Sequence, residues 1–245
     1  SVKSIAGLVY DKGRENFFLP EIGVYAENLP IAEVSNQSGA EVRRMFNLFN
    51  DTYLDAKNKF GQHHQLHSRL GIRVQSNKAE YDYGLGFNTA NDDYVNVGSG
   101  SNLLRQIRGG FGNWNWMNLY LTNNYSYKDR YLLSWDVAID GSSRFGSDPQ
   151  HNMLKFGQHA FAFNSAAHAA WIVSAENFFT SSAIDLLKLR GSFGWSGNDD
   201  IGDYAAKSYY LSQNLLGVQG LIRGNIGNPQ LQWERALKTN FGADL

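Results

Sequence analysis

Two carboxylates, Asp136 and Asp140, are the first residues whose types and spacing raise the question of catalysis. They lie on one face of an alternating segment, about 13 Å apart if that segment is extended. A glycosidase needs its two carboxyl groups roughly 5–9.5 Å apart. The pair therefore predicts charge on the polar side of a strand, balanced by Arg130 or Arg144. We expect no catalytic residues and no enzymatic activity.

One histidine group and one acidic group could each indicate a metal site. Their members are His63, His64 and His67, and Asp199, Asp200 and Asp203. The spacing of the first and last histidine favours a helix, whereas the residues after them alternate as in a strand. The carboxylates have the oxygen count of a weak Ca²⁺ loop but not the EF-hand spacing. We predict no metal ligands, with Ca²⁺ binding by the acidic loop left as an alternative to a polar extracellular turn.

Composition excludes several other kinds of chemistry. The chain has 245 residues, no cysteine and a net charge of −1. It can hold no disulfide, thiolate metal site or cysteine nucleophile, and its charge gives no reason to expect nucleic acid as a partner. The glycines at 98–100 and 108–112 lack the pattern of a nucleotide-binding loop, so we expect no cofactor. Without a run of about 18 apolar residues, helical membrane spans are excluded. A transmembrane β-barrel is not, because its strands are only half apolar.

Period-two alternation is the main structural signal, and it predicts the elements that position these residues. It runs through residues 66–75, 81–88, 131–140, 161–173, 187–195 and 237–245. Several of these segments approach or exceed the about 9–11 residues of a tilted membrane-crossing strand, whereas globular strands usually have about 5–6. Aromatic residues lie near the segment ends, as in the girdles of outer-membrane barrels. The polar faces suit a water-filled lumen.

An aromatic cluster follows the same alternation. Trp114, Trp116 and Tyr120 share one face, and aliphatic side chains occupy the other. If the aliphatic face meets lipid, the aromatic face points into the lumen, where sugars could stack. The ligand contacts proposed for the lumen are Trp114, Trp116, Tyr120, Arg130 and Asp136. The alternative is that the aromatic rings pack on a plug or a neighbouring loop.

The connections between the segments are unequal in length. A short turn surrounds Lys128 and Asp129, whereas 142–155 and 197–233 are long and polar, as in outer-membrane barrels. Residues 40–60 carry apolar side chains at helical spacing, which predicts one short helix in a loop. Residues 1–35 are ambiguous, with two strands broken by Pro20 and Pro30 as one interpretation.

Six ordered strings go beyond periodicity. They are NYSYKDRYL at 124–132, DGSSRFG at 140–146, AWIVSAENF at 170–178, LLKLRGSFG at 186–194, GNDDIGDY at 197–204 and NPQLQWE at 228–234. In this order they closely resemble the barrel of SusC/RagA-type TonB-dependent outer-membrane transporters, over roughly residues 60–245. The family usually has Phe-Pro-Ser before the Ala-Trp strand, where this chain has Phe163, Asn164 and Ser165.

The resemblance implies a fold and a location. The fold class is all-β: an antiparallel transmembrane β-barrel segment of about eight to ten strands, from a barrel of about 22 strands. Residues 1–245 are then one part of the receptor's β-barrel domain, because nothing here resembles the family's plug domain or its last strands. The location is the outer membrane of a Gram-negative bacterium.

The resemblance also implies active import of oligosaccharides or peptides. TonB would act through the absent plug domain, and a SusD-like surface lipoprotein would deliver the substrate to a barrel surrounded by outer-membrane lipid. Two alternatives remain open: a complete small passive porin or adhesin barrel, and a soluble β-rich carbohydrate-binding or hydrolase domain. The sequence does not name the substrate.

Overall fold

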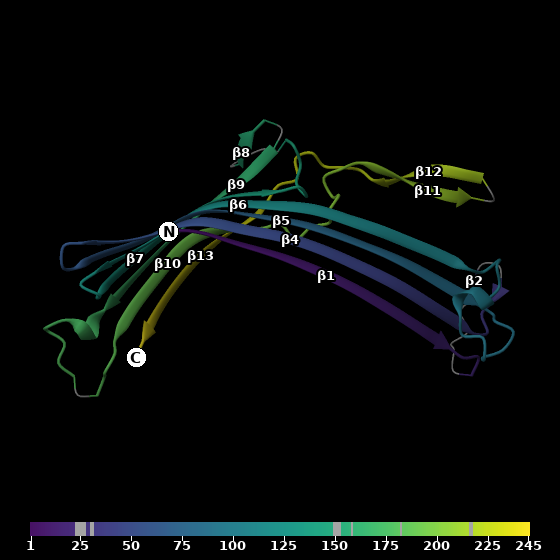
Figure 1. The fold of residues 1–245 in the computed structure, drawn as a ribbon, viewed down its shortest axis with the longest axis horizontal. Helices are drawn as coiled ribbons and strands as arrows, with labels where there is room; N and C mark the ends of the chain where they lie inside the picture. The colour runs from purple at the N-terminus through teal and green to yellow at the C-terminus, as the bar shows by residue number, and fades with distance from the viewer. Residues whose placement is uncertain (23–27, 30–31, 149–152, 158, 182, 216–217) are drawn as a thin grey trace. The chain divides into compact units, whose positions relative to one another are not determined.

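A computed structural model describes residues 1–22, 28–29, 32–148, 153–157, 159–181, 183–215 and 218–245 (Figure 1). These residues form two compact units, which are described separately. Unit 1 comprises Ser1–Gly7, Phe49–Gln75 and Trp114–Leu245. Unit 2 comprises Leu8–Leu48 and Ser76–Asn113.

Almost all regular structure is β-strand. The strands are β1 (Val2–Leu19), β2 (Asn28–Leu29), β3 (Ala32–Glu33), β4 (Gln37–Phe60), β5 (His64–Phe87), β6 (Gln106–Tyr127), β7 (Tyr131–Ser142), β8 (Met153–Phe156), β9 (His159–Ile172), β10 (Lys188–Asn198), β11 (Tyr209–Leu215), β12 (Val218–Asn225) and β13 (Glu234–Asp244). Two 3-10 turns, η1 (Val97–Ser99) and η2 (Val173–Ala175), are the helical elements of the described residues. None of the described helices has the length and apolar character needed to cross a membrane.

The main sheet has the strand order β1-β4-β5-β6-β7-β9-β10-β13, with β8 added on β9. The pairs with a defined register are antiparallel, and they align residues in rows across the sheet. One such row in unit 1 joins Tyr125, Leu133, Ala169, Gly191 and Phe241. This confirms the predicted all-β antiparallel sheet. Successive strands are neighbours in this order, as expected when short turns join antiparallel partners.

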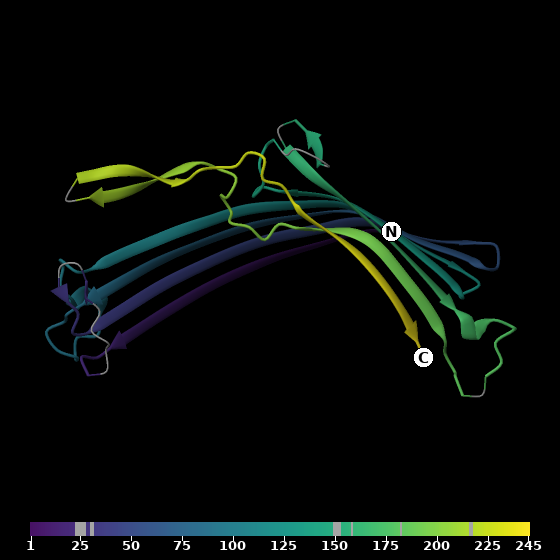
Figure 2. The same cartoon turned by 180° about the vertical axis from the view of Figure 1, so that it is seen from behind.

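At one end of the unit 1 strands, short turns join β4 to β5 and β6 to β7, and the longer segment 173–187 joins β9 to β10 (Figure 2). The connections from β7 to β9 and from β10 to β13 leave the other end. In the β6–β7 turn, Lys128 and Asp129 both have φ of 53°, the left-handed conformation that tight hairpins require. The predicted short turn at these residues is confirmed. The longer connections carry β8 after β7 and the separate β11–β12 hairpin after β10. This inequality is typical of outer-membrane barrels.

One face of the unit 1 sheet is apolar and exposed. On β7, Leu133 is 51% and Trp135 52% exposed, and on β10 Phe193 is 52% exposed. A soluble domain would bury such a face, because each large apolar side chain gains about 1.5–3 kcal/mol on leaving water. We call this the apolar face. Its composition fits contact with lipid.

The predicted helix at 40–60 is wrong, because these residues form β4. The apolar positions that fit a helical period also fit two strand faces, with Phe46, Leu48 and Leu54 on one side and Met45 and Phe49 on the other. Cross-strand pairing with β1 and β5 decides between the two readings. Periodicity alone cannot do so, because those partners are distant in sequence.

The structure defines the described part of region 1–35 and the two alternating segments 66–75 and 81–88. β1 ends at Leu19, directly before Pro20, as expected for a residue that cannot donate to a strand ladder. Pro30 lies outside the described residues. The two alternating segments form the single strand β5.

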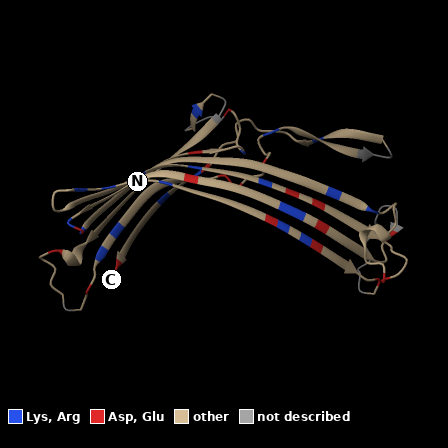
Figure 3. Ribbon diagram, in the orientation of Figure 1, with Lys and Arg blue, Asp and Glu red and all other residues tan. Residues whose placement is uncertain are grey.

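Unit 2 contains the other halves of β1, β4, β5 and β6 with their connecting segments. Its small core joins Val34, Phe87 and Leu104. Charged residues recur along these strand parts, as Figure 3 shows, and Arg44 bridges to Glu80 across strands at 2.6 Å. β4 and β5 have 24 residues each, more than twice the about 9–11 that cross a bilayer. These strands are therefore longer than a membrane crossing requires.

The apolar face yields a prediction for adjacent residues on β7. Leu133→Arg should destabilise the full-length receptor by about 2–4 kcal/mol if Leu133 lies near the bilayer midplane, because a cation would enter hydrocarbon. Ser134→Arg, at nearly the same depth on the opposite face, should cost far less. The measurement is a denaturant titration of folding into lipid vesicles. Equal losses at both positions would contradict the assignment of the two faces.

Candidate functional site

Polar side chains occupy the other face of the unit 1 sheet, which we call the polar face. Its members include Asp51, Asp55, His67, Arg69, Arg73, Asn118, Tyr120, Asp136, Asp140, Asn164, His168, Lys188, Arg190 and Asn240. They alternate along their strands with the apolar face and join neighbouring strands by hydrogen bonds. The polar face is therefore the part of unit 1 where specific recognition chemistry is concentrated.

A first group centres on Asp51 of β4. Its Oδ2 accepts from Arg73 Nη2 at 2.8 Å, and its Oδ1 accepts from the Tyr120 hydroxyl at 2.8 Å. Tyr120 reaches Asp51 by crossing β5 over Gly71, where an added Cβ would lie 2.5 Å from the tyrosine oxygen. A side chain at position 71 would therefore displace the ring. The absence of a side chain at Gly71 is what allows one tyrosine to link three strands.

A second group lies next to it on β4 and β5. Asp55 Oδ1 is 2.7 Å from His67 Nε2 and 3.4 Å from Arg69 Nη2. The Arg69 guanidinium lies 4.5 Å from the centre of the Tyr53 ring, within cation–π distance. Two of the three histidines that were weighed as a metal site have other contacts: His67 contacts Asp55, and His64 Nδ1 lies 2.6 Å from the Tyr125 hydroxyl.

A third group holds Asp140 between two amides. Asn118 Nδ2 donates to Asp140 Oδ1 at 2.6 Å, and Asn164 Nδ2 donates to Oδ2 at 2.8 Å. All three side chains are only 9% exposed. Phe145, Ala162 and Trp233 form a buried cluster nearby, and Trp116 packs against it. The group therefore joins the three strands β6, β7 and β9. Phe145 and Trp233 of the nearby cluster belong to the long connections.

The predicted ion pairs of the two β7 carboxylates are wrong. Asp140 is held by amides, and Asp136 Oδ2 lies 3.4 Å from His168 Nε2. Arg144 instead pairs with Asp203 at 2.9 Å. The true partners are cross-strand neighbours, which sequence spacing does not reveal.

The acidic connection between β10 and β11 is joined to the one after β7. Arg144 donates to Asp203 Oδ1 and to the Asp199 carbonyl, and its guanidinium lies 4.5 Å from the Trp114 ring centre. A cation already contacts this acidic segment. Within the described residues, no group of three or more acidic, histidine or cysteine side chains has the arrangement of a metal site.

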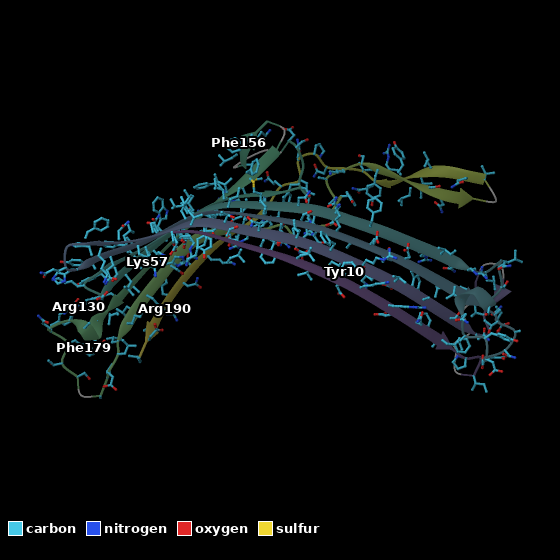
Figure 4. All side chains as sticks on the ribbon, in the orientation of Figure 1. Tyr10, Lys57, Arg130, Phe156, Phe179 and Arg190 are labelled. Carbon is cyan, nitrogen blue, oxygen red and sulfur yellow. The ribbon has the colours of Figure 1, made fainter. Side chains whose placement is uncertain are left out.

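The five predicted ligand contacts separate into two groups. Trp114, Trp116, Tyr120 and Asp136 have the strand parity of the polar face, but each already has a partner. Trp114 contacts Arg144, Trp116 packs on the Phe145–Trp233 cluster, Tyr120 binds Asp51 and Asp136 lies beside His168. Arg130 does not belong to the wall: it lies in the β6–β7 turn, as Figure 4 shows, and donates to Glu176 at 3.0 Å.

Glu176, just after η2, ties together the short-turn end of the apolar face. It accepts hydrogen bonds from Arg130 Nη1 and from Trp171 Nε1, at 3.0 and 3.1 Å. The Tyr131 and Trp171 rings stack with centres 6.2 Å apart. Hydrogen bonds from Tyr131, then from Trp171 and Arg130, hold the pKa of Glu176 below its ordinary value of 4.5. This anchors the aromatic pair where a membrane interface would lie.

Sequence reasoning missed several residues of the polar face. Asp51 was inside the expected helix, so its role as a cross-strand acceptor was not predicted. Arg190 was seen as polar by alternation, but its surroundings depend on the register of β10 with β9 and β13. The only local signal for the Tyr120 crossing was a glycine, Gly71, among the polar residues of an otherwise regular strand.

The amide pair around Asp140 gives a stability prediction. Asn164→Ala or Asn118→Ala should each destabilise the full-length receptor by about 1–3 kcal/mol, because a buried carboxylate oxygen loses its donor. Asn124→Ala is the matched control, since Asn124 lies on β6 with the parity of Asn118 and makes one exposed hydrogen bond with Ser134. It should change stability by less than about 0.5 kcal/mol. Denaturant titration measures all three, and equal effects would contradict the role of burial.

The Glu176 contacts predict a pH dependence. Because the folded pKa is depressed, the ionised carboxylate stabilises the fold at pH values above its ordinary pKa, and this contribution disappears as pH falls through the folded pKa. Glu176→Gln should therefore destabilise the full-length receptor at pH 7 and converge with the wild type as the pH falls through the folded pKa of Glu176, which lies below 4.5. Thermal unfolding measured across this range is the test. A constant difference at every pH would rule out the ionic contribution.

Comparison with known proteins gives consistent results. No family model matches the chain. The chain is 28% identical to TonB-dependent receptor P39 of Formosa agariphila over 99% of its own length and 22% of that protein. It is 31% identical to TonB-dependent receptor SusC of Bacteroides thetaiotaomicron over 50% of the chain and 12% of SusC.

The fold also matches a solved structure. A structure of the RagAB peptide transporter superposes with a TM-score of 0.79 and 19% identity, covering 99% of this chain and 26% of that one. The chain spans about a fifth to a quarter of the length of the P39 receptor and of this structure. Together with the two-faced antiparallel sheet, these relationships support a fragment similar to the SusC-like TonB-dependent receptors of the Gram-negative outer membrane.

Proposed function

We propose that this chain forms part of the wall of an outer-membrane importer that takes up oligosaccharides or peptides. Import is active: TonB energises it through a plug domain, and a SusD-like surface lipoprotein delivers the substrate. The chain itself makes and breaks no bond in the substrate. The whole receptor performs the activity, of which this chain supplies one sector of the barrel.

The two-faced sheet is the observation that carries the proposal. Its apolar face exposes large side chains suited to lipid, and its polar face carries charged, amide and aromatic groups suited to a wet interior. The family relationship adds the mode of transport, since the named relatives are TonB-dependent receptors. In this proposal the polar face lines the lumen.

Four of the proposed ligand contacts keep that role here: Trp114, Trp116, Tyr120 and Asp136. Arg130 is withdrawn because it lies in a turn and pairs with Glu176. The partners of Trp114 and Trp116 belong to the connections after β7 and β10, so ligand would meet these tryptophans together with those connections.

The test is energy-dependent uptake by the full-length receptor in its native outer membrane. Accumulation of the labelled oligosaccharide or peptide that supports growth should fall to background when TonB is deleted or the proton gradient is collapsed. A matched control is a porin-permeable sugar, whose entry should continue in both cases. Uptake that persists without TonB would refute the proposal and support the passive porin instead.

A further inference from the structure

The polar face contains a hollow between β7, β9, β10 and β13 whose lining carries cations and no carboxylate. Two adjacent cross-strand rows form it: Leu132, Ala170, Arg190 and Gly242, and next to them Ser134, His168, Ser192 and Asn240. Lys188 completes the lining. We propose that this hollow is a binding site for a carboxylate group, held chiefly by Arg190.

Arg190 is held in one orientation by its neighbours. Its guanidinium lies across Gly242, where an added Cβ would be 3.0 Å from both Cζ and Nε. Its Nε donates to Asp244 Oδ1 at 3.1 Å. These two contacts restrain the plane of the group before any ligand arrives, which reduces the entropy lost on binding.

The terminal nitrogens of Arg190 remain available. Neither Nη1 nor Nη2 has a hydrogen-bond partner in the part of the chain that the structure describes, and the side chain is 58% exposed. Two parallel N–H groups at this edge match the two oxygens of a carboxylate, the bidentate geometry that arginine forms best. Ala170 and Gly242, on either side of Arg190 in its row, leave room for the ligand.

The charges around the hollow favour an anion. Asp244 lies 3.1 Å from Arg190 and 3.8 Å from Lys188, so one carboxylate faces two cations and one positive charge is left over. In the neighbouring row, His168 is close to Asp136, and Asn240 Nδ2 donates to Ser192 Oγ. The hydroxyl and amide groups of this row can bind the polar remainder of a ligand. A cationic ligand would meet Arg190 and Lys188 in the lining, whereas Asp136 and Asp244 are not part of it.

The carboxylate can come from two sources, which share this chemistry. One is an acidic group on a molecule entering the barrel. The other is an aspartate or glutamate from a part of the receptor outside this chain. The inference goes beyond import, because both tests below measure occupancy of the hollow and give their answer whether or not the receptor transports anything.

The external source is tested with 4-fluorobenzoate as the probe and the purified full-length receptor in detergent. Its ¹⁹F signal should broaden with the wild type, and the affinity should fall at least about tenfold in Arg190→Gln. Arg190→Lys keeps the positive charge but loses the two parallel N–H groups, so the probe should also bind weakly to this variant. Arg235→Gln is the matched control on β13, because Arg235 lies over Trp195 of the apolar face and away from the hollow.

The internal source is tested by carbodiimide coupling of Lys188 to a neighbouring carboxylate, with mass spectrometry to identify the product. The Asp244→Asn background removes the local carboxylate 3.8 Å from Lys188. A link from Lys188 to an acidic residue elsewhere in the receptor, reduced by Arg190→Gln, would show that the site is filled from within.

Either positive result supports the carboxylate site and names its source. The inference is overturned if the probe binds no more weakly to Arg190→Gln than to Arg235→Gln and Lys188 couples to no carboxylate in the Asp244→Asn background. Each variant should show the same change in electrophoretic mobility on heating as the wild type, which shows that it is folded before heating. A loss of binding can then be assigned to the site.

Discussion

Backbone hydrogen bonding in an apolar environment is the constraint on which this structure depends. A peptide group that meets hydrocarbon has no water to bind, so each N–H and C=O must pair within the protein. Among the described residues, antiparallel neighbours satisfy this requirement on both sides of β7, β9 and β10, and on the β10 side of β13. The pairing fixes the register, and the register brings residues that are far apart in sequence into the same row. The groups around Asp140 and Arg190 are consequences of those rows.

The side chains on the two faces of the sheet differ in how they contact their neighbours. On the apolar face, large side chains contact one another through their rings, as the stacked Tyr131 and Trp171 do. On the polar face, the side chains are linked across strands. Asp51 accepts hydrogen bonds from an arginine and a tyrosine, and Asp140 accepts hydrogen bonds from two asparagines. Arg190 differs from these residues, because within the described residues neither of its terminal nitrogens has a hydrogen-bond partner.

The sequence predicted those features that depend on near neighbours. Alternation along β7 and β13, the turn at Lys128 and Asp129 and the in-or-out parity of Trp114 and Tyr120 all follow from local spacing. The helix expected at 40–60 failed because apolar residues on both faces of β4 imitate a helical period. The partners of Asp136, Asp140 and Arg144 could not be predicted, because they depend on register between strands that only the fold determines.

The crossing of Gly71 by Tyr120 has a consequence for how this sequence can vary. A side chain at position 71 and an aromatic ring at position 120 compete for the same space, since an added Cβ would lie within 2.5 Å of the ring. Phe17 over Gly39 and Phe49 over Gly7 impose the same exclusion. Among descendants of this sequence, enlargement of the glycine and loss of the ring should therefore occur together. Such paired changes would record in the sequences themselves that β1 neighbours β4 and that β5 neighbours β6.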